Sequence, residues 1–344
     1  MKKLLGFLRT SILLLALVVC SYIAYDLYAG NNKNTKAASE EAVNNNTILN
    51  LGDVLSTIAA SQNGDGGSSK TKDDVKSDYQ PLSGTGALVT DSSQTGTGAT
   101  QQYDFPEKMY PYRAMLTDNQ KKVYDQIYEE INSCTKEVKL CTQLDATGIS
   151  NVMTAVFNDH PEQFWLETSY TYGYTSKGTV VSVTLQYNET ADTLQTSRQK
   201  FLTAAGNIIN QASGYGTDVE KEKAVYKAIQ NSCAYDENSA MNQSAYSALV
   251  NKSSVCAGYA RAFQYIMMQM NVPTYFCSGY ANGGNHAWNI VCLDGKYYNT
   301  DISWDDSLGE ITNSISYSYF NLSDNAFSAD HTRRELSQKL PKCN

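Results

Sequence analysis

The sequence contains few histidines and no run of basic residues. Only His160, His286 and His331 occur among its 344 residues, so a histidine base, if the chain uses one, is one of these three. Lys and Arg number 27 against 35 Asp and Glu, which gives a formal net charge of -8 at pH 7. Because phosphate binding needs clustered Lys and Arg, this balance argues against a nucleic-acid partner.

The first 29 residues have the pattern of a targeting segment. Lys2, Lys3 and Arg9 precede an apolar run over residues 12–24. Positive charge stays on the cytoplasmic side, so the rest of the chain is expected to be extracytoplasmic. Residues 27–29 (LYA) match a cleavage site poorly, which favours a signal anchor over a cleaved signal peptide. The chain is thus expected to be membrane-anchored by its N-terminus, or secreted.

Residues 30–102 are poor in aromatic side chains and in proline, with Tyr79 and Pro81 as the single examples. Such a composition cannot bury enough apolar surface to offset chain entropy, so a disordered low-complexity linker is expected. From Tyr103 onward, tyrosines and periodic apolar residues become dense. Residues 103–344 are therefore predicted to form the folded domain.

This folded part shows helical patterns first and strand patterns later. Thr117 and Gln120 have the spacing of a capping box at a helix start. Further helices are predicted over about residues 149–157, 194–211 and 219–233, and a strand over about 179–187, which alternates and is β-branched. No repeat with a fixed period is present. The order of elements favours an α+β fold in a single domain.

The eight cysteines raise the question of disulfides in an exported chain. Cys20 lies in the targeting segment and leaves seven, an odd number, so at least one thiol has no partner within the chain. Cys134 and Cys141 are close enough in sequence for a local bridge. The alternative is that all seven are buried free thiols.

Cys256 begins a strongly apolar helical pattern. Ser253 or Ser254 can cap this helix, which would place Cys256 in its first turn. There the helix dipole and unpaired backbone N–H groups stabilise a thiolate, the nucleophilic form of cysteine. Taken alone, a cysteine at a helix start is more often structural.

A β-hairpin is predicted around Asp294-Gly295, a strong short-range turn signal that pairs Leu293 with Lys296.

In this register Trp288 pairs with Asp301, and His286 lies opposite Ser303. His286 and Asp301 are then diagonal neighbours on one face of the hairpin, where a ring and a carboxylate can touch. A turn longer by one residue would place them on opposite faces. The alternative for His286 is an idle, hydrogen-bonded core histidine.

A thiolate, a histidine that moves protons and a carboxylate that orients it are the groups needed for acyl transfer through a thioester. His160 precedes a proline between a helix and a strand and is interpreted as a structural or surface residue. His331 lies in a polar C-terminal segment. His286 is therefore the expected base.

The segments VCAGYARAF (255–263) and NHAWNIVCLDGKYYNTDISWDD (285–306) closely resemble the transglutaminase-like superfamily. Residues 319–324 and His331 look like the closing segment of bacterial secreted members. The resemblance implies a papain-like fold, in which a central helix that begins with the cysteine packs on an antiparallel sheet. It also implies Cys256 as nucleophile, His286 as base and Asp301 as the residue that orients the histidine. Thr300 stands where many members have valine. The chain lacks the cysteine-pair zinc site of some relatives, so no metal and no cofactor is implied.

The residues that would stabilise the oxyanion are less defined. The backbone N–H of Cys256 is one expected donor. Gln243 is a candidate for the second, with Asn242 and Trp288 as rivals. Gln243 as a helix cap and Trp288 as a wall of the site or a core residue are the alternatives. Asn299 is expected either to support the site or to be exposed.

The resemblance implies a thiol enzyme that acts on glutamine or peptide amides. An amine acceptor would give protein crosslinking, and water would give deamidation or proteolysis. Location alone suggests cell-wall or surface proteins as the protein or peptide substrates. The alternative is a catalytically silent surface binding or adhesion module, for which the 25 tyrosines would suit a recognition surface.

Overall fold

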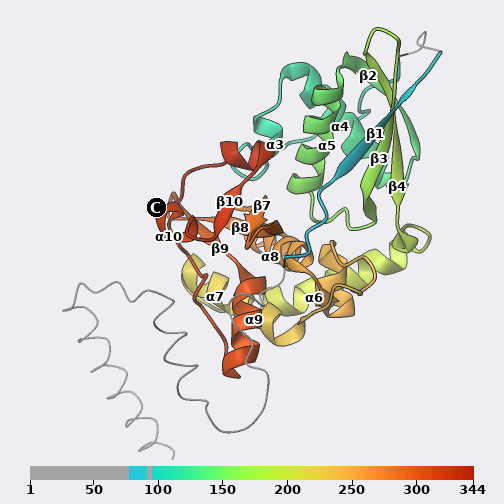
Figure 1. Ribbon diagram of the computed structural model, residues 1–344. Coiled ribbons are helices and arrows are strands. Elements are labelled where there is room, and N and C mark those ends of the chain that lie inside the picture. The colour runs from blue at the N-terminus through green and yellow to red at the C-terminus, as the bar shows by residue number, and fades with distance from the viewer. Residues whose placement is uncertain (1–76, 91–94) are drawn as a thin grey trace, which may run out of the picture. The chain divides into compact units, whose positions relative to one another are not determined.

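The computed structural model describes residues 77–90 and 95–344, which belong to one compact unit, Lys70–Asn344. The predicted targeting segment (1–29), Cys20 and most of the predicted linker lie outside the described residues. The described part combines helices with two four-stranded sheets, which confirms the predicted α+β class (Figure 1).

The first sheet has the strand order β1-β3-β4-β2. Its strands are β1 (Ser83–Leu88), β2 (Glu137–Leu144), β3 (Leu166–Tyr174) and β4 (Val180–Tyr187). β1 is parallel to β3, whereas the other pairs are antiparallel. Two helices, α4 (Asp118–Asn132) and α5 (Ala146–Asp159), pack together beside it. The capping box of Thr117 and Gln120 at the start of α4 is confirmed, as are the helix around 149–157 and the strand around 179–187.

The second sheet has the strand order β10-β7-β8-β9 and is antiparallel. It contains β7 (Thr274–Ala281), β8 (Gly284–Leu293), β9 (Lys296–Thr300) and β10 (His331–Arg333). Asp294 and Gly295 have positive φ of 50° and 77°, as the two central positions of a type I′ turn require. Leu293 pairs with Lys296, so the predicted register is confirmed.

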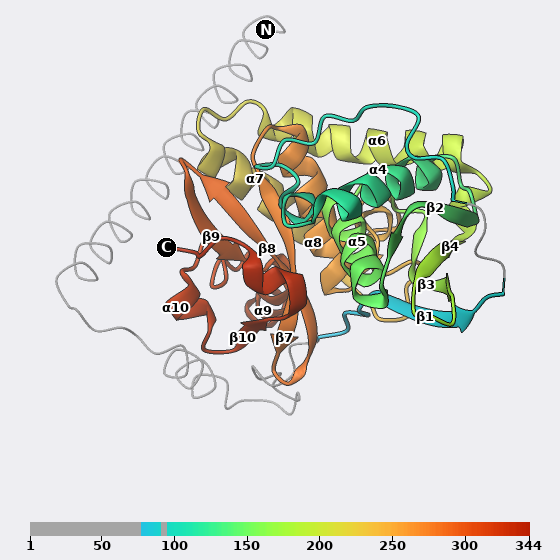
Figure 2. The same cartoon turned by 90° about the horizontal axis from the view of Figure 1, so that it is seen from above.

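The helix α8 (Cys256–Gln269) lies at the centre of this half of the molecule (Figure 2). It packs on β7 and β8 and against α6 (Leu194–Ala212), α7 (Asp218–Ser232) and α9 (Ile302–Thr312), which confirms the two helices predicted over 194–211 and 219–233. Gly258 allows the close approach of the preceding loop, because a Cβ there would lie 1.8 Å from Ser254 Oγ. The remaining short elements are α3 (Pro111–Ala114), η2 (Glu189–Ala191), β5 (Ala234–Tyr235), η3 (Ser247–Asn251), β6 (Ser253–Ser254), α10 (Asp324–Phe327) and η4 (Glu335–Lys339).

The predicted end of the linker at residue 102 is wrong. Residues 77–90 and 95–102 have defined positions in the described domain, where Tyr79 is buried and β1 extends the first sheet. The glycines that made this stretch look disordered fit closely under tyrosine rings of β3. A Cβ at Gly84 would lie 2.4 Å from Tyr170 Cζ, and one at Gly86 would lie 2.8 Å from Tyr172 Cζ. The glycines of this stretch are therefore required by packing, because a larger side chain would collide with the tyrosine rings.

Two smaller expectations are also corrected. Ser253 and Ser254 form β6 and do not cap α8, whose N-cap is Val255 with no side-chain hydrogen bond. All seven cysteines of the described residues are free, so the bridge between Cys134 and Cys141 is not formed. Over the ranges 77–90 and 95–344, no helix is both long and apolar enough to cross a membrane.

Candidate active site

Cys256 is the first residue of α8, in the first turn as predicted. Its side chain is fully buried, in a cluster with Ala257, Ala260, Phe276 and Ala287. At this position the free N–H groups of the first helical turn and the helix dipole favour negative charge on sulfur. The apolar walls exclude water from the thiol.

His286 on β8 contacts Asp301, which follows the end of β9. The His286 Nε2 to Asp301 Oδ2 distance is 2.6 Å, and both side chains are buried. Among the described residues, the other ring nitrogen, Nδ1, has no hydrogen-bond partner of good geometry. The thiol of Cys256 is nevertheless close enough to raise the pKa of the ring. The predicted pair therefore meets, and Cys256 lies near enough to act on the same ring.

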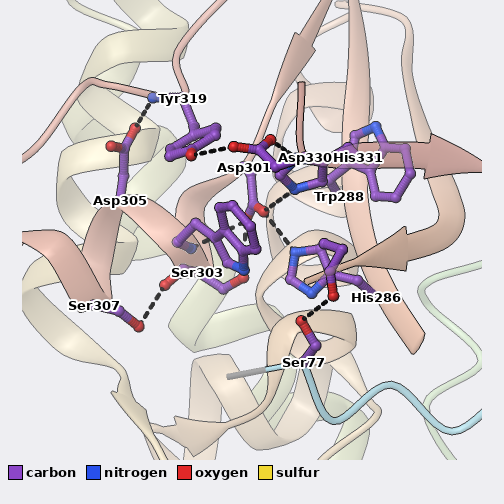
Figure 3. Close-up of polar contacts among 12 residues, drawn as sticks. Ser77, His286, Trp288, Asp301, Ser303, Asp305, Ser307, Tyr319, Asp330 and His331 are labelled. Carbon is purple, nitrogen blue, oxygen red and sulfur yellow. Dashed lines mark hydrogen bonds and ion pairs between the residues drawn. The ribbon is translucent and has the colours of Figure 1, made fainter. Parts of the chain in front are cut away.

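Asp301 performs two structural tasks with its two oxygens. Oδ1 accepts hydrogen bonds from Trp304 N at 3.1 Å and from Ser303 Oγ at 2.8 Å, which makes Asp301 the N-cap of α9. Oδ2 faces His286 and also His331, whose Nε2 lies 3.2 Å away (Figure 3). The hairpin register predicts Asp301 and Ser303 in the second strand. This is wrong, because β9 ends at Thr300 and Ser303 is already in the first turn of α9.

Two opposing effects set the pKa values of His286 and Asp301: burial disfavours the charged forms, and the contact between the two side chains favours them. Burial alone would lower the pKa of His286, but the carboxylate of Asp301 and the neighbouring Cys256 outweigh burial and raise this pKa to about 10. Burial would likewise raise the pKa of Asp301, whereas His286 and His331 hold it below its ordinary value. The site therefore stabilises an imidazolium beside a carboxylate, the arrangement that orients and charges the histidine of a Cys-His-Asp site.

His331 on β10 is the site residue that the sequence analysis did not assign. It was interpreted as part of a polar C-terminal segment, but it is buried, with Nδ1 2.6 Å from Asp330 Oδ1. Its ring packs against Phe327 at 3.9 Å and Trp304 at 4.3 Å between centroids. The available signal was its likeness to the closing segment of secreted superfamily members.

The third histidine, His160, takes no part in this site. It is buried among aromatic rings at the end of α5, with Nε2 2.8 Å from Tyr124 Oη and Nδ1 2.7 Å from Glu162 Oε1. His160 is thus a structural residue and not a surface residue.

His286, Asp301 and His331 also form a set of potential metal ligands, since one donor atom from each lies within 4.8 Å of the others. Two imidazoles and one carboxylate suit a transition metal by chemistry. However, the 2.6 Å contact between His286 Nε2 and Asp301 Oδ2 is a hydrogen-bond length. The arrangement therefore suits a proton shared in a hydrogen bond between His286 and Asp301.

Trp288 and Asn299 support the site from behind. Trp288 is buried, stacks near His286 with a centroid distance of 6.2 Å, and donates from Nε1 to Asn299 Oδ1 at 3.2 Å. Asn299 is also buried and donates to Asp324 Oδ1 at 2.9 Å. Trp288 is therefore buried beside the His286 ring, and Asn299 is buried behind Trp288 and is not exposed.

Gln243 lies in the loop before α8 and binds another part of the chain. Its Nε2 donates to the backbone carbonyl of Asp78 at 3.1 Å, and its Oε1 accepts from the N–H of Gln80 at 3.0 Å. Asn242 lies beside it and donates to Glu237 O. Gln243 is thus no helix cap, and its amide is placed to hold a peptide backbone.

The free energy of unfolding should fall above neutral pH because of His286. Its pKa of about 10 in the folded chain exceeds the ordinary value of 6.5, so its stabilisation is complete below about pH 6.5 and is lost as the pH rises through about 10. In urea titrations between pH 7 and pH 10, we expect the stability difference between wild type and His286→Gln to shrink. A constant or growing difference would contradict this protonation of His286.

One family model and several solved structures are similar to parts of this chain. The model of the transglutaminase-like superfamily matches residues 207–302. One similar solved structure is described as the crystal structure of a TGase, with 16% identity, 48% of this chain and 50% of that chain covered, and a TM-score of 0.28. Another is the periplasmic domain of TgpA from Pseudomonas aeruginosa bound to ethylmercury, with 12% identity, 39% of this chain and 59% of that chain covered, and a TM-score of 0.28.

The chain thus spans only about half to three-fifths of the length of these structures. None of the curated proteins compared with it matches. The matched residues 207–302 nevertheless include α8, β7, β8 and β9 and extend through Cys256, His286 and Asp301. Residues 207–302, which hold all three residues of the candidate site, are thus the part of this chain that resembles the transglutaminase-like superfamily.

Proposed function

We propose that this protein is a thiol acyl-transfer enzyme that acts on glutamine or peptide amides through Cys256, His286 and Asp301. The observation that carries the proposal is the 2.6 Å contact between His286 and Asp301, beside a cysteine at the start of a buried helix. A carboxylate, a charged imidazole and a helix-start thiol supply every proton-transfer and nucleophilic group that a thioester mechanism needs.

In the first step, His286 holds the proton of the Cys256 thiol, the resulting thiolate attacks the carbonyl carbon of the amide, and the carbonyl π electrons move onto oxygen until they return as the C–N bond breaks. His286 then gives its proton to the leaving nitrogen, the C–N bond breaks, and ammonia or an amine departs. The acyl group remains on Cys256 as a thioester. Asp301 keeps the ring in place and stabilises its charged form.

In the second step, His286 takes a proton from the acceptor while the acceptor attacks the thioester carbon. The C–S bond breaks and Cys256 is regenerated. An amine acceptor yields a crosslinked product, whereas water yields deamidation or cleavage. The backbone N–H of Cys256 is the proposed oxyanion donor, and the Gln243 amide is the proposed second donor.

The proposed location and substrate class rest on the N-terminal sequence. The basic residues and apolar run at the N-terminus support an extracytoplasmic, anchored or secreted enzyme. Proteins or peptides of the cell wall or cell surface are the substrates within reach of such an enzyme.

A catalytically silent binding module is the second candidate. One observation favours it, since Cys256 has no exposed surface in this structure. A silent module, however, has no use for a buried imidazole and carboxylate that cost desolvation energy.

The proposal is tested by incubating the full chain with a glutamine-bearing peptide library and a primary amine, followed by mass spectrometry. Amine adducts, deamidated peptides and cleaved peptides separate the three reactions. We expect one of these products with wild type and none with Cys256→Ala. The absence of all three with every peptide, or their persistence in Cys256→Ala, would sink the enzymatic proposal.

A further inference from the structure

Residues Ser77–Gln80, here called the covering segment, lie across the start of α8 and along the start of β8. Figure 1 draws this segment in blue, passing α8 on its way to β1. Ser77 Oγ donates to Ala281 O at 3.3 Å, and the Tyr79 N–H donates to Asn285 O at 3.3 Å. Asn285 is the residue before His286, so the segment reaches the edge of the candidate site. Ser77 is drawn beside His286 in Figure 3.

The backbone of the covering segment is held from both sides. While β8 accepts the N–H of Tyr79, Gln243 binds the carbonyl of Asp78 at 3.1 Å and the N–H of Gln80 at 3.0 Å. Contacts of this kind, to backbone groups before and after one side chain, are how proteins bind extended peptides regardless of sequence. The amide of Gln243 would serve a separate peptide equally well.

The side chain of Tyr79 fills the space above the nucleophile. Its ring is buried in the cluster of Cys256, Ala257, Ala260 and Phe276, and lies 5.8 Å from the Phe276 ring between centroids. Cys256 has no exposed surface within this cluster, of which the Tyr79 ring is a part. A substrate carbonyl therefore cannot reach the sulfur while Tyr79 is in place.

Polar groups lie around the covering segment. Tyr235 Oη donates to the Asp78 carboxylate at 3.1 Å. The buried guanidinium of Arg261 interacts electrostatically with Tyr79, and its Nε and Nη2 have no hydrogen-bond partner within the described parts of the chain. Gln80 borders a cavity of 180 Å³ that Gln243 and Arg261 also line. Space for a longer ligand thus continues past the segment.

We propose that the covering segment lies in the acyl-donor groove in the manner of a bound peptide, so that the chain's own Tyr79 competes with the acyl donor for access to Cys256. This rests on the proposed function for the nature of the groove. Release of the segment must precede acylation of Cys256.

The test measures access to Cys256 rather than turnover. Full-length wild type and Tyr79→Gly are treated with iodoacetamide near neutral pH, and each thiol is quantified by mass spectrometry. We expect alkylation of Cys256 to become at least about tenfold faster in Tyr79→Gly, while the buried Cys277 and Cys292 stay unreactive. Tyr79→Phe keeps the ring and should behave like wild type.

A synthetic peptide with the sequence of residues 77–82 (SDYQPL) is then added to the Tyr79→Gly chain. We expect it to slow alkylation of Cys256 again, whereas the same peptide with glycine in place of tyrosine should not. If Tyr79→Gly does not fold, Tyr235→Phe is used instead; it removes only the hydrogen bond to Asp78, and should still give about a twofold acceleration at Cys256.

Three results would overturn the proposal: an unchanged rate at Cys256, a parallel rise at Cys277 and Cys292, or no effect of the peptide. The parallel rise would mean that Tyr79 is an ordinary core residue. These readouts do not depend on whether the protein turns over an amide substrate. If the enzymatic proposal alone is wrong, Tyr79→Gly exposes the thiol but forms no product; if the covering-segment proposal alone is wrong, products form and thiol access does not change.

Discussion

Cys256→Ala should abolish turnover, with a loss of at least about 10⁴-fold, while the domain stays folded. The reason is that no other thiol of the described residues lies beside His286, so the thioester cannot form. The side chain lost is small and sits in an apolar cluster, so the free energy of unfolding should change by only about 1–2 kcal/mol. Product formation and urea unfolding, measured on the same preparation, check both parts.

The matched control for Cys256→Ala is Cys292→Ala. Cys292 is a buried free thiol on β8, the strand that carries His286, but it lies at the other end of that strand. Its removal should cost comparable stability and leave turnover unchanged. Equal losses of turnover in the two variants would mean that packing, not nucleophilicity, explains the effect.

Asp301→Asn should lower turnover by about 10³–10⁴-fold. An amide keeps the shape and retains an oxygen that can accept from Trp304 N and Ser303 Oγ, so the cap of α9 is preserved. It removes the charge that raises the pKa of His286 and that His331 also faces. Asp301→Ala should lose the same activity and a further ~1 kcal/mol of stability with the helix cap.

Asp305→Asn is the control for charge removal in α9. Asp305 is buried and accepts from Tyr226 Oη at 2.5 Å and from the N–H groups of Ser318 and Tyr319, but no hydrogen bond joins it to His286. This variant should lose about 1–3 kcal/mol of stability and keep turnover. If Asp301→Asn turned over substrate at the wild-type rate, the orienting role that we assign to Asp301 would be wrong.

Features encoded by short stretches of sequence could be predicted well. Asp294-Gly295 specifies its turn because both positions need positive φ, and that turn fixes which residues of β8 and β9 face each other. The capping box of Thr117 and Gln120 is likewise complete within four residues. Both depend on local geometry alone.

Features that depend on distant partners could not be predicted. The sequence of β1 is rich in glycine and therefore resembles a linker. These glycines are needed to fit the rings of Tyr170 and Tyr172, which lie more than 80 positions later in the chain. His331 reaches Asp301 only because β10 pairs with β7, where His331 lies opposite Ala281. No periodicity in the sequence indicates either pairing. The role of Gln243 was similarly hidden, because its amide binds the covering segment far earlier in the chain.

The most direct test of the account is to locate the covalent intermediate. The Tyr79→Gly chain is mixed with a glutamine-bearing peptide, quenched in acid and digested, and the acylated residue is identified by mass spectrometry. The account predicts a peptide, minus ammonia, joined as a thioester to Cys256, and no adduct in Cys256→Ala. An adduct on a different residue, or amide turnover with Cys256 unmodified and dispensable, would contradict it.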